Sequence, residues 1–147
     1  MVKNQLLNKM DINDCFKKRI LKKIPKNLEK TNSSIKIAEA KLGEAKKLFS
    51  AGFFSNAVLS VYTLMFHSAR AILYKDGIQE KSHYATYIYI KEKYSNKISK
   101  NLLNSFNLLR MDRHEILYGF EENISKEETG NAILDAEDFL TEVKNLL

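Results

Sequence analysis

Three residues spaced one helical turn apart carry side chains suited to phosphate chemistry. Arg110, His114 and Tyr118 follow one another at intervals of four residues, so on a helix they stack along one side. Arginine is a fixed cation that binds phosphate, and histidine exchanges protons near neutral pH. The same residues could also form an ordinary half-buried helix face, with the Arg110 stem covering the core and His114 hydrogen-bonded at a helix contact.

The reaction that these side chains favour is metal-independent RNA cleavage, in which a 2′-hydroxyl attacks the neighbouring phosphate. His114 would act as general acid or base. Arg110 and Arg113 would hold the phosphate and stabilise the charge that develops on it. Tyr118 would orient the histidine or stack on a base. Because one arginine–histidine set makes a thin site, a homodimer that places two sets across a two-fold axis would be more convincing.

Other histidines and tyrosines give weaker signals. His67 and Arg70 lie on a narrow polar strip of an otherwise apolar helix and are secondary site candidates, but pairing with acidic groups of the last helix, such as Asp135 or Glu137, is the preferred interpretation, since buried charges need partners. His83 follows Ser82 at a predicted helix start, where capping and turn roles are the default. The tyrosines at positions 84, 87, 89 and 94 are more typical of packing between helices than of base stacking.

The elements that must position these residues are helices. The chain has 147 residues, about one domain, with only five glycines and one proline. A basic helix is predicted over residues 6–24 and ends at Pro25. Residues 31–34 offer N-cap side chains for a second helix, which Gly52 closes. Residues 53–76 are apolar around most of the helix circumference, which predicts a buried central helix that stops at Asp76-Gly77.

The second half of the chain continues the pattern. We expect a short helix from Tyr84 to Tyr94 and a longer one over residues 99–118, ended by Gly119. Ser125 and Glu128 form a capping-box pattern. The last helix is expected to bury five apolar residues: Ile133, Ala136, Leu140, Val143 and Leu147. The predicted fold is an all-α, up-and-down bundle of four to five main helices, with residues 1–30 as a basic lead-in and residues 31–147 as the bundle.

Charge and composition limit the function classes. The net charge is +6 over residues 1–30, +7 over residues 31–110 and −7 over residues 111–147, an asymmetry seen in nucleic-acid or partner surfaces and also in ordinary solvated helices. Cys15 is the single cysteine. We find no signal-peptide pattern and no long apolar run, so we expect a cytoplasmic protein without a membrane partner. Glycine-rich phosphate loops, metal-ligand spacing and nucleophile elbows are missing from the sequence, and we expect no cofactor.

Four segments, in order, resemble the HEPN domain proteins of prokaryotes, and together they span nearly the whole chain. They are Lys23-Ile-Pro-Lys-Asn-Leu-Glu-Lys30, the stretch from Ala51-Gly-Phe-Phe-Ser-Asn-Ala57 to Val61-Tyr-Thr-Leu-Met-Phe-His-Ser-Ala-Arg-Ala-Ile-Leu73, Lys75-Asp-Gly-Ile-Gln-Glu-Lys-Ser-His83, and Arg110-Met-Asp-Arg-His-Glu-Ile-Leu-Tyr-Gly119. The resemblance implies a four- to five-helix bundle, a homodimer, and pairing with a small nucleotidyltransferase in toxin–antitoxin modules.

Active family members are ribonucleases in which four to six residues separate an arginine from a histidine, whereas three separate Arg110 from His114 here. Some members also carry a tyrosine two residues after the histidine, which the partner transferase modifies with AMP, whereas Tyr118 lies four residues after His114. Two hypotheses follow. One is a toxin-type endoribonuclease that uses His114, Arg110 and Arg113. The other is a catalytically inactive helical module that partners a nucleotidyltransferase and recognises nucleotide or RNA.

Overall fold

The computed structural model describes residues 10–119 and 123–147 and confirms the all-α prediction. One small two-stranded sheet accompanies the helices. In chain order the elements are α2 (Ile12–Lys17), β1 (Leu21–Lys23), α3 (Leu28–Ser50), α4 (Phe54–Asp76), β2 (Ile78–Glu80), α5 (His83–Tyr94), α6 (Lys100–Tyr118) and α7 (Lys126–Leu146).

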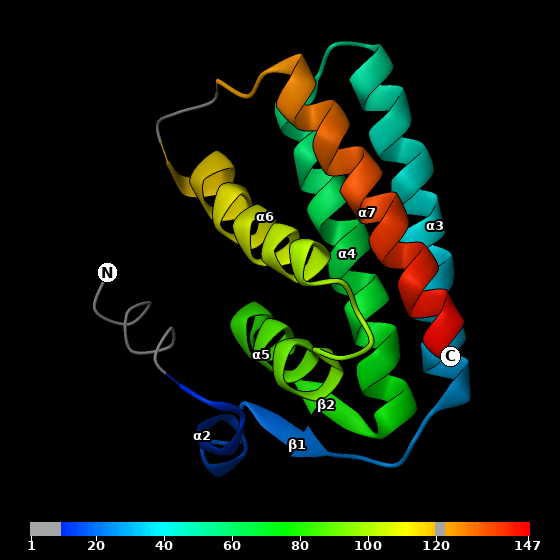
Figure 1. Ribbon diagram of the computed structural model, residues 1–147, viewed down its shortest axis with the longest axis vertical. Coiled ribbons are helices and arrows are strands. Elements are labelled where there is room, and N and C mark those ends of the chain that lie inside the picture. The colour runs from blue at the N-terminus through cyan, green and yellow to red at the C-terminus, as the bar shows by residue number, and fades with distance from the viewer. Residues whose placement is uncertain (1–9, 120–122) are drawn as a thin grey trace.

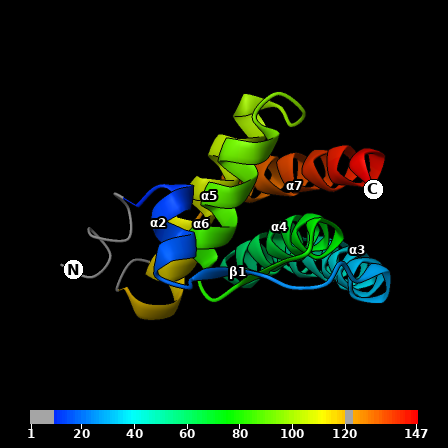
Figure 2. The ribbon, with the colours of Figure 1, turned by 90° about the horizontal axis from the view of Figure 1, so that it is seen from below.

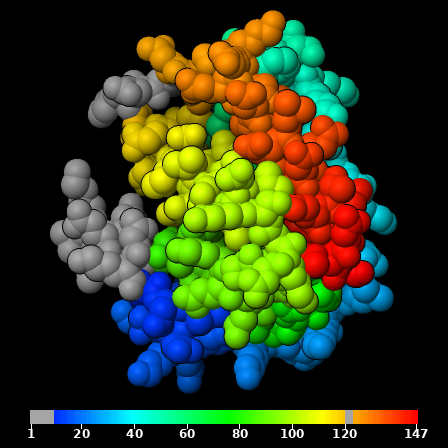
Figure 3. All heavy atoms as spheres, viewed as in Figure 1, coloured from blue at the N-terminus to red at the C-terminus, as the bar shows by residue number. Residues whose placement is uncertain are grey.

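The long helices α3, α4 and α7 run side by side, and α5 and α6 cover the remaining side of α4 (Figure 1). Seen from below, α3 and α4 lie next to each other with α7 above them, while α5 lies to the left of α4 and α2 farther out on the same side (Figure 2). In the space-filling view α5, α6 and α7 form one continuous face (Figure 3). The arrangement leaves α4 in contact with every other long helix.

Helix α4 is the buried centre of the bundle, as its apolar circumference predicts. The predicted centre line of α4 holds Phe54, Val58, Val61, Met65, Ser68 and Ile72, and all of these are buried except Phe54, which is partly buried. The Ser68 hydroxyl is satisfied by donating to the Leu64 carbonyl at 2.8 Å. By length and composition α4 could cross a membrane, but 72% of its most apolar window is buried inside the bundle, as in the core helix of a globular domain.

Most helix ends fall where the sequence places them. Gly52 follows α3, and Gly77 ends α4 in the left-handed conformation with φ of 75°. The Ser125 hydroxyl caps α7 by accepting from the Glu128 backbone N–H. The predicted start of α3 is wrong, because Asn27 caps that helix and residues 31–34 lie inside its first two turns. Leu147, predicted to be buried, is 44% exposed.

The predicted helix over residues 6–24 is wrong in its second half, and residues 6–9 lie outside the described part of the chain. Helix α2 ends at Lys17, and Arg19 takes a left-handed φ of 56° that turns the chain. Residues 21–23 then pair antiparallel with β2, with Leu21 opposite Glu80. The sheet ties the amino-terminal segment to the turn between α4 and α5.

The Tyr-rich segment forms α5, and its tyrosines mainly pack, as predicted. Tyr87, Tyr89 and Tyr94 are buried. The Tyr89 and Tyr94 hydroxyls both donate to the Asp76 carboxylate, at 2.8 and 2.6 Å. These bonds fasten the second half of α5 to the end of α4.

We expect Phe106→Ala to lower the free energy of unfolding by about 3–5 kcal/mol, because it empties a fully buried site in contact with other aromatic rings. Leu134→Ala in α7 is the control, since Leu134 is 60% exposed and its truncation should cost less than about 0.5 kcal/mol. Urea unfolding followed by circular dichroism measures both. Equal effects for the two variants would contradict this packing.

Gly77→Ala should destabilise the protein more than Gly52→Ala. Both glycines have positive φ, so both variants carry the same backbone strain. A Cβ at Gly77 would lie 2.6 Å from the Ile24 carbonyl oxygen, whereas a Cβ at Gly52 would meet open space. We expect a difference of at least about 1 kcal/mol between the two variants in thermal unfolding. A Gly52 variant that is as unstable as the Gly77 variant would show that the contact with Ile24 is unimportant.

Candidate functional site

The middle of α4, the start of α5 and the carboxyl-terminal half of α6 meet around the imidazole of His83. The Tyr62 hydroxyl and His83 Nδ1 are 2.7 Å apart and hydrogen-bonded. The His83 ring stacks on Phe66 with centroids 4.3 Å apart and on Tyr62 at 5.6 Å. Three roughly parallel rings therefore hold the imidazole in one orientation.

Local sequence explains why these rings meet. Ser82 caps α5 by accepting from the Ala85 N–H, which makes His83 the first residue of the helix. Tyr62 and Phe66 are one turn apart on α4 and so face the same direction. Tyr62 is 1% exposed and also stacks against Phe106 of α6, with centroids 6.0 Å apart. Tyr62, which is itself fixed in the core, therefore holds the His83 ring in place.

Two arginines of α6 lie against this aromatic group. The Arg110 guanidinium stands 5.1 Å from the Tyr84 ring centroid, and the Arg113 guanidinium 5.7 Å from that of Tyr62. Arg110 also donates to the Asn107 side-chain oxygen at 3.1 and 3.2 Å. Neither arginine makes a salt bridge to a carboxylate within the described residues. Their charges are therefore available to an anion.

Arg70 differs from these two arginines because it has a carboxylate partner. Its guanidinium pairs with the buried Glu80 of β2 at 2.9 Å, so the predicted pairing with α7 is wrong. The acidic side chains of α7 go elsewhere: Asp135 accepts from the Ser105 hydroxyl, and Glu137 pairs with Lys46. Arg70 lies on the same side of the bundle as His83, and both line a surface hollow of about 350 Å³ with Phe66, Glu80, Lys81 and Ser82.

Burial and the surrounding cations keep the His83 imidazole neutral. Burial, followed by the charges of Arg113, Arg110, Arg70 and His67, lowers the pKa of His83 to about 4. Burial, with Arg70 and Lys41 as smaller causes, also lowers the pKa of His67. Burial raises the pKa of Tyr62 well above its ordinary value, so its hydroxyl keeps its proton. At neutral pH the site combines cationic arginines with uncharged hydrogen-bonding groups.

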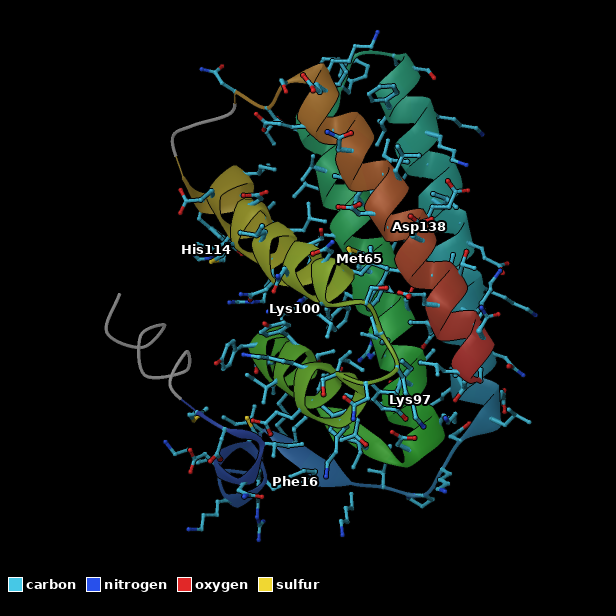
Figure 4. All side chains as sticks on the ribbon, viewed as in Figure 1. Phe16, Met65, Lys97, Lys100, His114 and Asp138 are labelled. Carbon is cyan, nitrogen blue, oxygen red and sulfur yellow. The ribbon has the colours of Figure 1, made fainter. Side chains whose placement is uncertain are left out.

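His114 and Tyr118 lie at the outer edge of the site. Both are exposed, and their rings contact each other with centroids 5.1 Å apart. His114 points away from the bundle in the side-chain view (Figure 4). Arg110, Arg113 and His83 therefore come together, whereas His114 reaches the same region only from the solvent side. His67 lies beneath, edge-on to Phe66, and its Nδ1 is buried without a hydrogen-bond partner among the described residues.

A second surface hollow, near α6, is lined by acidic side chains rather than by arginines. It measures about 250 Å³ and is lined by Asp112, Glu115 and Glu128 among others. Burial and the nearby Glu128 raise the pKa of Asp112. These carboxylates would repel phosphate. Across residues 10–119 and 123–147, no three His, Cys, Asp or Glu side chains gather as a metal site. The region around His83 is thus the better place for an anionic ligand.

A family model described as HEPN domain matches residues 31–146. The chain belongs to this family. A UPF0332 protein from Archaeoglobus fulgidus is 32% identical over 116 residues, which cover 76% of this chain and 90% of the relative. A protein named "Putative toxin MJ0605", from Methanocaldococcus jannaschii, is 32% identical over 129 residues, which cover 81% of this chain and 90% of the relative. The resemblance read from the four sequence segments is confirmed.

Sequence reasoning about this HEPN protein missed His83. Its position directly after a capping serine suggested a turn role, and it does begin α5. One sequence signal could have pointed to it. Tyr62, Phe66 and Arg70 are spaced four residues apart, so they lie on one face of α4 next to the polar strip that includes His67. That strip is the only part of α4 with several ionisable groups, so residues placed over it were candidates for a site.

We expect His83 to titrate at about pH 4 in the folded protein. Because this pKa lies below the ordinary value of 6.5, the unfolded chain binds the proton first as pH falls. The contribution of His83 to stability is therefore complete above about pH 6.5 and is lost as the pH falls towards 4. Imidazole NMR should show a higher pKa for His83 in Arg113→Gln and an unchanged one in Lys36→Gln, an exposed control on α3. A His83 pKa near 6.5 in the wild type would contradict the electrostatic account.

Proposed function

We propose that this HEPN protein binds RNA through Arg110 and Arg113 and cleaves it without a metal ion, as the toxin of a toxin–antitoxin pair. The observation that carries the proposal is that both guanidiniums lie over aromatic rings, with no carboxylate partner among the described residues. Such a pair is suited to the two oxygens of a phosphodiester. The relative named as a toxin supports the same class of function.

The roles follow from position. Arg110 and Arg113 hold the phosphate and offset the charge that builds up as the 2′-oxygen attacks. His114, one turn from Arg110 and open to solvent, transfers a proton to or from the reacting oxygens. Tyr118 is 69% exposed beside it and offers a ring on which a base can stack. Arg70 lines the same hollow as His83 and adds a positive charge that Glu80 offsets, while His67 lies beside Phe66 on α4 as an uncharged polar neighbour.

The outer face of α6 supports a homodimer. Leu108, Met111 and Tyr118 are 56%, 41% and 69% exposed, and their spacing places them on one face of the helix. Exposed apolar side chains in a row are a feature of protein contacts. Pairing through this face would bring together two copies of the α6 end, each carrying His114.

A second candidate function is a catalytically inactive module that binds RNA and partners a nucleotidyltransferase. The exposed hydroxyl-bearing ring of Tyr118 favours it, because a transferase can reach that side chain directly. In that case the arginines still bind phosphate, but no strand is cut.

The decisive experiment is incubation of purified protein with end-labelled RNA in EDTA. We expect the wild type to cut RNA, and His114→Ala to cut it at least about 100-fold more slowly, the usual effect of losing an acid–base group. A strand with 2′-deoxyribose should stay intact. Wild type without activity, or His114→Ala with equal activity, would contradict cleavage at this site.

Binding is measured separately by fluorescence anisotropy, so that the two candidate functions can be told apart. The double variant Arg110→Gln/Arg113→Gln should bind RNA about 10-fold or more weakly and reduce the salt slope by about 1.4. Lys36→Gln controls for a lost charge away from the site. RNA binding without cleavage would favour the inactive module, and unchanged binding by the double variant would contradict both.

A further inference from the structure

Cleavage through a 2′-hydroxyl requires two proton transfers: one from the attacking oxygen and one to the leaving oxygen. His114 can supply one of them. Within the described residues of one chain, the other imidazoles are His67 and His83, and in a homodimer the second copy would add another His114. His67 is a poor choice, because its Nδ1 is buried and it lies beneath Phe66 rather than beside the arginines.

His83 has the fixed orientation that a proton-transfer group requires. Its Nδ1 is bonded to the hydroxyl of Tyr62, and Tyr62 is itself locked between Phe66 and Phe106. The other ring nitrogen, Nε2, has no hydrogen-bond partner among the described residues and is not a buried orphan atom. His83 lines the hollow of about 350 Å³ with Arg70 and Lys81, and because Nδ1 is bonded to Tyr62, Nε2 is the nitrogen left for a ligand.

The charges around the ring come from every element packed against it. Arg70 and His67 lie on α4, Arg110 and Arg113 on α6, and the paired Glu80 on β2. A phosphodiester held by Arg110 and Arg113 would bring a negative charge into this cationic group. Its arrival would offset the repulsion that now disfavours the imidazolium, so that a proton on His83 becomes easier to hold when substrate is bound.

We propose that His83 is the second catalytic residue of the site, the base that accepts the proton of the attacking 2′-hydroxyl, with Tyr62 as its positioning residue. This inference rests on the proposed function. In the base-competent tautomer, Nδ1–H donates to the Tyr62 oxygen and Nε2 faces the substrate. The same relation of an orienting group behind a histidine recurs in many hydrolytic sites.

The RNA strand, His83 and His114 account for every proton and bond in the cleavage step. The 2′-hydroxyl proton moves to Nε2 of His83, and the 2′-oxygen forms a bond to the adjacent phosphorus. The bond from phosphorus to the 5′-oxygen breaks, and that oxygen leaves with a proton from the imidazolium form of His114. The products are a 2′,3′-cyclic phosphate and a 5′-hydroxyl. Arg110 and Arg113 hold the non-bridging oxygens throughout.

The test compares four proteins in EDTA: wild type, His83→Gln, Tyr62→Phe and Tyr89→Phe. We expect His83→Gln to cleave at least about 100-fold more slowly and to bind a non-cleavable 2′-deoxy strand within about 3-fold of wild type, with the acid limb of its pH–rate profile lost. Tyr62→Phe keeps the ring but not the bond to Nδ1, and should cleave about 10-fold more slowly. Tyr89→Phe is the matched control, because it removes a hydroxyl bonded to Asp76, away from the site.

An independent readout does not require turnover. Imidazole NMR of His83 should show its pKa rising by at least about one unit when the 2′-deoxy strand binds, as expected for an anion placed beside it. Thermal unfolding confirms that each variant is folded. An inactive wild type would refute the proposed function and this inference together. If the wild type is active, an equally active His83→Gln variant would refute the inference alone. A His83 pKa that stays unchanged when the 2′-deoxy strand binds would do the same.

Discussion

The structure depends on the burial of α4. This helix packs against α3, α5, α6 and α7, and it contributes more buried apolar side chains to the core than any other described element. Its apolar surface leaves one strip with ionisable groups, and the site is built over that strip. Tyr62 belongs both to the core and to the site. Its side chain is 1% exposed, and its hydroxyl is hydrogen-bonded to His83. A side chain held on all sides by packing is a better support for a reactive group than a loop residue.

The positive charges around the site repel one another and disfavour a proton on His83. Arg70, Arg110 and Arg113 all disfavour a charged His83, and only Arg70 is neutralised by a carboxylate among the described residues. The two α6 arginines are tolerated because they are half-exposed and lie over tyrosine rings, where a cation is stabilised by the ring electrons. Glu80 offsets the charge of Arg70 alone, so binding an anion would relieve the repulsion from Arg110 and Arg113.

Helix-level periodicity predicted α4, α6 and α7 well, because their apolar stripes and end signals at Gly77, Gly119 and Ser125 are local, whereas the α5 segment has no clean period and was also compatible with a strand. The strand at 21–23 escaped prediction, since it exists only through pairing with residues 78–80 far along the chain. The α6 arginines were found from their spacing. His83 was not, because its neighbours Tyr62, Phe66 and Arg113 come from other helices and no sequence window contains them together.

The central claim is that Arg110, Arg113 and His83 form one phosphate-binding site. The most direct measurement is side-chain NMR of the arginine Nε–H and histidine ring signals during titration with a short 2′-deoxy oligonucleotide in EDTA. The account predicts that the largest changes occur together at these three residues, at one common affinity that weakens with salt. Changes confined to the basic α2–β1 segment, with Arg110, Arg113 and His83 unaffected, would contradict it.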